Sequence, residues 1–403
     1  MFKNSIFKKQ PIFIPKLCQN EAGFVANKKL PSILMGAHIV QNFPKPVLKI
    51  KNSAEIFIID PSTNYFTEQQ YTKESCLSKL STSPEKPYKI EDLLTNEKLR
   101  KYEMVEKNID FQIENNANLV IVPYIYMDST DDSRFGINLS MVSDSIKLKK
   151  DKKINLPLYA MINIGSSILN DTSKLDYLIK RYDEDFGNEI EGYFIMIDKL
   201  NCKNSDKDLL LGLAYLIFNL SENKDVFILS IDDFGEILCS IGASGYSSGL
   251  GGGETFNSEK LIKKLFGRTR KHKEITYVPD FFNYINDEAL KKIGYKCDCC
   301  ACNKKIPNTF NETRQHFLNI KISAAEKLEA LDQENKLKYM ISRVEEANSS
   351  INKFKSELML LINANFLIIW KEILEEVVNW DHKINKKEEV DIDKIIEEVN
   401  KNE

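Results

Sequence analysis

The stretch Gly192-Tyr-Phe-Ile-Met-Ile-Asp198 decides the fold, because its apolar residues follow one another without polar alternation. A strand of this kind is buried on both faces, as in parallel sheets that are covered by helices. Seven further short apolar runs occur in the first 250 residues, at 11–15, 33–38, 55–60, 119–127, 156–164, 226–232 and 242–247. Eight such strands, separated by helix-like segments, predict an α/β fold, a (β/α)₈ TIM barrel. The alternative is an open doubly wound sheet, and the strand count favours the barrel.

Composition limits the classes of partner. The chain has 403 residues and a net charge of −3, so any contact with nucleic acid must be local rather than global. The basic N-terminus is not followed by an apolar region of the signal-peptide kind. The longest apolar stretch, 358–370, contains Asn363 and Asn365 and is too short and too polar to span a membrane. We therefore expect a cytoplasmic protein with no membrane segment.

Half of the eight cysteines lie in the segment 297–302, in Lys-Cys-Asp-Cys-Cys-Ala-Cys-Asn at 296–303. Cys297, Cys299 and Cys302 form a C-x-C-x-x-C pattern, and His316 follows fourteen residues after the last of them. Three thiolates and one imidazole complete a tetrahedral set for a structural Zn²⁺ and leave no position for water. The alternatives are a cluster of free thiols, or a disulfide, which neighbours this close in sequence rarely form. The predicted units are a barrel at 1–248, a zinc-binding subdomain at 249–325 and a helical, coiled-coil-like extension at 326–403.

Polar residues recur where the predicted strands end, which is where barrels of this class carry their sites. They are Asp60, Asp128, Asn163, Asp198, Asp232 and Ser247. Any one of them alone would be read as a helix cap or a solvated loop residue. Together, facing carboxylates and amides could act as acid and base or bind a ring that carries N–H donors.

The order of these elements resembles the tRNA-guanine transglycosylases, a superfamily of (β/α)₈ barrels with a structural zinc subdomain after the last strand. The cysteine motif with His316 is the specific part of the resemblance, although the gap before the histidine is shorter than in the family. Asp60 stands where the family has Asp-Ser-Gly-Gly-Phe, but the glycines are missing. Asp128 stands at the end of the strand that reads the guanine edge, and Asn163 retains an amide at the family's Gln-Gly-Gly turn.

The resemblance implies a carboxylate nucleophile at the end of the last strand, and two alignments of that strand remain. Counting strands places Ser247 there, in Gly242-Ala-Ser-Gly-Tyr-Ser-Ser248. Matching Gly249-Leu-Gly-Gly-Gly-Glu254 to the family's Gly-Leu-x-x-Gly-Glu would instead make Asp280 or Asp298 the nucleophile. We prefer the strand count. Asp60 is a candidate catalytic residue in either alignment, and Asp280 is one in the second. Asp128, Asn163 and Ser247 are the candidate base-binding residues.

The segment after the predicted barrel offers a local case for phosphate binding. Gly251 and Gly252 belong to a glycine-rich loop that could cradle phosphate or serve as a hinge. A run of seven Lys or Arg residues follows at 260–273, beside the cysteines, and a solvated amphipathic helix is its alternative. The candidate phosphate contacts in it are Lys263, Lys264, Arg268, Arg270 and Lys271. The C-terminal helices, expected up to Trp380, would pack on the barrel, on a partner protein or on a second copy.

Two functions follow from the resemblance. The first is a pentosyltransferase that exchanges guanine for a 7-deazaguanine in tRNA or DNA. The second is a catalytically inactive relative that binds a base or nucleic acid as a subunit of a modification or defence complex. The direction of Asp280, towards the barrel mouth or towards the zinc module, is expected to distinguish them.

Overall fold

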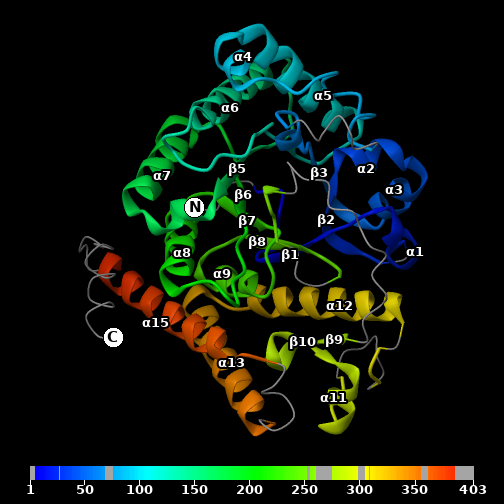
Figure 1. The fold of residues 1–403 in the computed structure, drawn as a ribbon, viewed down its shortest axis with the longest axis vertical. Coiled ribbons are helices and arrows are strands. Elements are labelled where there is room, and N and C mark those ends of the chain that lie inside the picture. Colours follow the sequence, from blue (N-terminus) through cyan, green and yellow to red (C-terminus); the bar gives the residue numbers. More distant parts are fainter. Residues whose placement is uncertain are drawn as a thin grey trace.

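The structure, a computed structural model, contains eight parallel strands in one sheet (Figure 1). It describes residues 5–26, 28–68, 76–251, 255–259, 275–297, 305–307, 309–354 and 362–385. The strands are β1 Ile12–Lys16, β2 Leu30–Gly36, β3 Ala54–Asp60, β4 Val120–Ile121, β5 Leu158–Gly165, β6 Gly192–Asp198, β7 Asp225–Leu229 and β8 Gly245–Gly249. Each of the eight predicted strands is present, so the fold expected from the apolar runs is confirmed.

The sheet curls into a nearly closed barrel. Its strand order is β3-β2-β1-β8-β7-β6-β5-β4, so the first and the last strand of the chain are neighbours. Between β3 and β4 the gap is bridged by Asn118, whose N–H donates to Phe57 O at 2.9 Å. Its side-chain oxygen accepts from Phe57 N at 2.7 Å. The pairing of β1 with β8 and this bridge exclude the open doubly wound sheet.

Helices connect the strands and cover the outside of the barrel. They are α1 Ala22–Val25, α2 Ala37–Asn42, α3 Pro44–Lys51, α4 Ile90–Thr95, α5 Lys107–Glu114, α6 Ser133–Asp151, α7 Thr172–Phe186, α8 Lys207–Ser221 and α9 Phe234–Ile241. After β8 come β9 Ile275–Val278, β10 Asn283–Asn286, α11 Asp287–Lys292, α12 Phe310–Glu329, α13 Gln333–Lys353 and α15 Asn365–Asn385.

The long helix α12 lies beside β1 and takes the place of the eighth outer helix (Figure 1). Its Phe317 meets Phe13 of β1 edge to face, with ring centroids 6.2 Å apart. The segment between β8 and α12 is therefore an insertion in the last β–α connection, and it carries the β9–β10 hairpin and α11. Most of the predicted zinc-binding unit at 249–325 belongs to this insertion, and its last part, from Phe310 onwards, is a helix of the barrel wall.

Alternate residues of each strand point into the barrel and form an inner apolar cluster. It includes Ile14, Leu34, Ile58, Met161, Phe194, Met196, Phe227 and Leu229. The rings of Phe194 and Phe227 stack there with centroids 5.2 Å apart. This packing fills the lower and middle layers of the barrel, so polar side chains on the same faces can only gather at the carboxyl ends of the strands.

The C-terminal helices pack on the barrel rather than projecting from it. Helix α13 contacts α9, and α15 contacts both α8 and α9. The indole N–H of Trp370 donates to Cys202 O at 3.0 Å, and the Trp380 ring meets Phe218 of α8 with centroids 5.8 Å apart. Among the expected locations of these helices, the structure therefore shows the barrel surface. None of the helices in the described segments has the length and apolar character that a membrane span requires.

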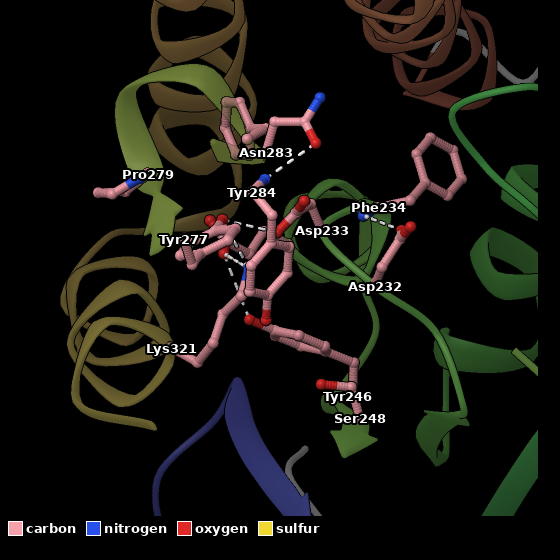
Figure 2. A network of polar contacts seen from close by, with 12 residues as sticks. Asp232, Asp233, Phe234, Tyr246, Ser248, Tyr277, Pro279, Asn283, Tyr284 and Lys321 are labelled. Carbon is pink, nitrogen blue, oxygen red and sulfur yellow. Dashed lines mark hydrogen bonds and ion pairs between the residues drawn. The ribbon is translucent and has the colours of Figure 1, made fainter. Parts of the chain in front are cut away.

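A buried network of charged side chains joins α9, α12 and α13 (Figure 2). Lys321 of α12 is fully buried and donates to Asp233 at 2.5 Å, Glu236 at 2.6 Å and the Tyr277 hydroxyl at 3.0 Å. Arg343 of α13 donates to the second oxygen of Glu236 at 2.8 Å. Burial alone would lower the pKa of Lys321, but the two carboxylates raise it, so the lysine stays charged.

Candidate functional site

The carboxyl ends of the strands carry a layer of polar side chains above the inner apolar cluster. Alternation along β3 places Asp60 on the same face as Ile58, and along β5 it places Asn163 on the same face as Met161. On β8, Ser247 pairs in register with Ile14 and with Leu229, which both belong to the inner cluster. Asp60, Asn163 and Ser247, three of the predicted site residues, therefore all face the barrel interior at its mouth.

Asp60 is held in a fixed orientation at the end of β3. Its Oδ1 accepts the Ser62 N–H at 2.8 Å and the Tyr124 hydroxyl at 2.9 Å. The other carboxylate oxygen makes no hydrogen bond within the described residues, and the side chain is 8% exposed. Burial, together with the nearby Asp60 charge, raises the pKa of Tyr124 well above its usual value, so the phenol remains a neutral donor. Asp60 can thus present one free oxygen to a ligand.

His38 reaches the same end of the barrel. A Cβ on Gly36 would lie 2.7 Å from His38 Cε1 and 3.5 Å from Ser62 Oγ, so the imidazole covers Gly36 beside the Asp60 turn. Its Nδ1 is buried without a hydrogen-bond partner among the described residues. Burial lowers the pKa of His38, while the Asp60 charge acts in the opposite direction. His38 therefore lies at the barrel mouth, next to Asp60.

Asn163 and Ser247 are completely buried and have unsatisfied polar atoms. Both amide atoms of Asn163 and the hydroxyl of Ser247 lack a hydrogen-bond partner in the described part of the chain. A buried polar group without a partner costs about 1–3 kcal/mol, so native proteins rarely keep one without a reason. These unsatisfied atoms make the barrel mouth a site where a polar ligand or water would gain hydrogen bonds.

A short segment, 255–259, lies over part of this mouth. Phe256 forms an isolated parallel bridge with Asp198, and its ring packs against the inner apolar cluster. Ser258 donates its backbone N–H and its hydroxyl to the two oxygens of Asp198, and the Tyr126 hydroxyl adds a longer bond of 3.2 Å. In this arrangement the strand-end carboxylate of β6 is satisfied from within the protein.

Two predicted site residues lie away from this inner layer. Asp128 is exposed on the loop after β4 and accepts a hydrogen bond from Tyr126. Asp280 is exposed and lies in the short 3₁₀ turn Pro279–Phe281 between β9 and β10, outside the eight barrel strands. Ser247 lies inside β8, two residues before the strand ends at Gly249.

The structure brings together two of the four predicted zinc ligands. Cys297 and His316 are both buried, and Cys297 Sγ lies 3.4 Å from His316 Nδ1. The opposite ring nitrogen, Nε2, lies 2.7 Å from the Tyr277 carbonyl, which fixes the tautomer that leaves Nδ1 with its lone pair towards the thiol. A sulfur and a nitrogen that share one tetrahedral zinc ion are about 3.6 Å apart, from Zn–S of about 2.3 Å and Zn–N of about 2.05 Å. These two residues therefore fit a zinc ion.

Other predicted site residues fall outside the described residues. Cys299 and Cys302 do so, as do Gly252, Lys263, Lys264, Arg268, Arg270 and Lys271. Gly251 is described and is exposed, with open space where a Cβ would be. Within the described part of the chain, no three His, Cys, Asp or Glu side chains are grouped as metal ligands.

Tyr124, Tyr126 and Ser258 are site residues that the sequence analysis did not single out. Tyr124 and Tyr126 follow β4. Leu119 and Ile121 point into the barrel, and this alternation ends at Pro123. The alternation alone could have placed one aromatic hydroxyl at the mouth. Nothing in the sequence around Ser258 predicts that this residue contacts Asp198.

Comparisons with known proteins add little to this geometry. No protein-family model matches the chain, and no curated protein matches it. One solved structure that resembles it is a "putative phosphonomutase" from Burkholderia cenocepacia J2315, at 11% sequence identity and a TM-score of 0.34. The likeness covers 60% of this chain and 88% of that one, and it is too distant to bear on function.

Proposed function

We propose that this protein is a zinc-bearing relative of the tRNA-guanine transglycosylases that binds a guanine-type base of a nucleic acid at the barrel mouth. The observation that carries the proposal is the pair of buried, unsatisfied side chains Asn163 and Ser247 on the same inner layer as Asp60. A guanine-type edge offers N–H donors next to a carbonyl oxygen. Asp60 would accept from the N–H groups, while the Asn163 amide and the Ser247 hydroxyl would bond to the remaining polar atoms.

The turn that holds Asp60 supports the relationship. Ser62 has a φ of 55°, in the left-handed region that glycine adopts most easily. It stands two residues after Asp60, where the family has the first glycine of Asp-Ser-Gly-Gly-Phe. The backbone shape of that segment is therefore compatible with the family even though the glycine is missing.

The placement of the carboxylates favours binding without the family's covalent step. A carboxylate is the nucleophile in that reaction because it is ionised at neutral pH without a neighbouring base. The last strand offers Ser247 instead, and Asp280 lies in the β9–β10 turn. His38 lies beside Asp60 on the β2–β3 side of the barrel, whereas Ser247 is on β8. We therefore favour a base-binding subunit over a pentosyltransferase, with tRNA or DNA as the nucleic acid.

The predicted zinc ion would stabilise the insertion next to this site. Cys297, Cys299, Cys302 and His316 are the residues that would hold it. A closed set of three thiolates and an imidazole would hold the ion for structure and would supply no reactive water. The ion would tie the β9–β10 hairpin to α12 through His316 and Tyr277.

The test combines equilibrium binding with a trapping assay. Guanine and 7-deazaguanine are titrated against the protein and against Asp60→Asn and Asn163→Leu, and labelled tRNA is run on a denaturing gel. We expect base binding that falls at least tenfold in both variants, with no covalent band. Asn163→Leu should fold with equal or greater stability, because it removes an unsatisfied buried amide. Absence of base binding would refute the proposal. A covalent band that is lost in Asp280→Ala would instead support the pentosyltransferase function.

A further inference from the structure

A cavity of about 360 Å³ lies on the outer side of the strand ends of β6 to β8. Ser248 faces it, whereas the preceding residue, Ser247, faces the barrel interior. The other walls come from the β6–α8 connection, the start of α9, β10, α12 and the start of α15. The cavity shares no lining residue with the barrel-mouth site. Its volume is at the small end of the range of ligand sites, which suits a ligand of nucleoside size.

Asp232 is the acidic group of this cavity. Figure 2 shows its carboxylate pointing away from the buried charge network, whereas the neighbouring Asp233 points into it. Within the described residues its one hydrogen bond is from Phe234 N to Oδ1, at 3.3 Å. Burial raises the pKa of Asp232, against the opposing charge of Lys203. The protein thus keeps a half-buried carboxyl group at the wall of a cavity without using it for its own packing.

Three asparagines on the cavity wall present donors. Asn201, Asn283 and Asn363 each accept a backbone N–H with Oδ1, from Lys203 at 3.3 Å, Tyr284 at 2.9 Å and Asn365 at 3.1 Å. A backbone N–H must meet the oxygen, so these bonds also fix which side-chain atom is nitrogen. The three NH₂ groups make no hydrogen bond within the described part of the chain. They offer donors to carbonyl or ring-nitrogen acceptors of a ligand.

The remaining wall is apolar and aromatic. Phe317 and Phe366 are almost fully buried there, and Tyr284 stacks on Phe317 with centroids 5.9 Å apart. The Tyr284 hydroxyl is itself buried without a partner among the described residues. Such a wall suits the face of a planar ring.

The charges around the cavity exclude a strongly anionic ligand. Three cations lie near the cavity: Lys203, Lys321 and Arg343. They form ion pairs with Asp233 and Glu236, and Asp232 is the third carboxylate, so the three negative charges equal the three positive ones. Lys203 is engaged, since it donates to Asp233 at 2.7 Å and to Phe282 O. The described residues give the cavity no surplus positive charge that would offset the cost of placing a phosphate beside Asp232. A neutral ligand fits it better.

We propose that this cavity binds a neutral lactam-type heterocycle of nucleoside size, whose ring N–H donates to Asp232 and whose carbonyl accepts from the asparagine NH₂ groups. Uracil, hypoxanthine and guanine carry this pattern of an N–H beside a carbonyl. The ring lies against Phe366 and Phe317. This second site is independent of the base-binding proposal for the barrel mouth.

The experiment titrates free uridine, inosine, cytidine, adenosine, D-ribose and inorganic phosphate against the full chain by calorimetry. The variants are Asp232→Asn, Ser248→Leu, which adds bulk inside the cavity, and Asp60→Asn at the barrel mouth. Asp206→Asn is the matched control, because Asp206 is an exposed carboxylate on the same β6–α8 connection. Circular dichroism checks that each variant is folded.

We expect uridine, which does not carry the guanine-type base proposed for the barrel mouth, to bind, and its affinity to fall at least tenfold in Asp232→Asn and in Ser248→Leu. Asp60→Asn and Asp206→Asn should leave it unchanged. Because Asp60→Asn separates the two sites, failure of the barrel-mouth proposal would leave this result standing. Equal binding of ribose or phosphate, preference for adenosine and cytidine, an effect of Asp60→Asn equal to that of Asp232→Asn, or no nucleoside binding would each overturn the proposal.

Discussion

Ser258 occupies both oxygens of Asp198, with its N–H 2.5 Å from Oδ1 and its hydroxyl 2.7 Å from Oδ2. Both oxygens of the carboxylate at the end of β6 are therefore already hydrogen-bonded within the protein. The ring of the nearby Phe256 packs against the inner apolar cluster. A base that also formed a bond to Asp198 would have to displace this contact, so we expect the 255–259 segment to compete with it.

Replacing Ser258 by alanine tests that competition. Ser258→Ala removes the hydroxyl but keeps the backbone N–H, and it should cost about 1–2 kcal/mol of unfolding free energy. We expect guanine to bind more tightly than to the parent protein, because Oδ2 of Asp198 becomes available. Urea unfolding and calorimetric titration measure the two effects. Weaker guanine binding in Ser258→Ala would show that the segment supports the ligand instead of competing with it.

Lys321 is the centre of the buried network that fastens α12 to α9. Lys321→Met keeps the length of the side chain but leaves Asp233 and Glu236 with less compensation inside the protein. Removing one partner of a buried ion pair typically costs about 3–5 kcal/mol, and we expect a loss of that size in urea unfolding. Lys338→Met is the matched control, because Lys338 pairs with Glu334 on an exposed helix surface and should change nothing measurable. Equal effects of the two variants would refute a special role for the network.

The proposed zinc ion makes a prediction about metal content. The purified protein should contain one zinc per chain by mass spectrometry, and Cys297→Ala or His316→Ala should lose it. Cys239→Ala is the control, because Cys239 is equally buried but lies on α9. Chelation should lower the thermal midpoint of the parent protein and leave that of the His316→Ala variant unchanged. Full zinc content in Cys297→Ala would assign the site to other residues.

The barrel strands could be predicted because each is an apolar run of the right length, and burial on both faces leaves few alternatives. β4 shows the limit of that approach. The run 119–127 predicts one long strand, yet the ladder is interrupted after Ile121, because Pro123 has no N–H, and pairing returns only as a single bridge between Met127 and Ile164. Thr63 and Asn138 side chains then accept the N–H groups of Tyr124 and Ile125 in place of a neighbouring strand.

The residues of the candidate site could be predicted only where they belong to the predicted strands. Asp60, Asn163 and Ser247 could be proposed for the mouth because they lie near the ends of predicted strands, but the same criterion also chose Asp128, which is exposed on a loop. The buried Lys321 has no such signal, since a lysine on an amphipathic helix is usually solvated. Its position depends on Asp233 and Glu236, which lie more than 80 residues earlier in the chain.

The adjacent carboxylates Asp232 and Asp233 should respond to pH in opposite ways. Burial alone would raise the pKa of Asp233, but Lys203 and Lys321 outweigh it and hold that pKa well below its usual value. Its stabilising effect is therefore complete above a pH of about 4, the usual range of an aspartate, and is lost as the pH falls through the lower folded-state value. Asp233→Asn should be less stable than the parent at pH 7, with a smaller difference in acid.

For Asp232, burial raises the pKa and the nearby Lys203 only partly offsets it. The folded state then holds the proton more tightly than the unfolded state, so stability falls as the pH rises from about 4 through the folded-state value. Asp232→Asn should therefore be more stable than the parent at pH 7, and equal to it in acid. Urea midpoints at pH 7 and near pH 2, below the usual range of an aspartate, measure both variants. A gain in stability together with a loss of nucleoside binding would identify Asp232 as a residue kept for a ligand at a cost to the fold, whereas a loss of stability at pH 7 would make it a structural residue.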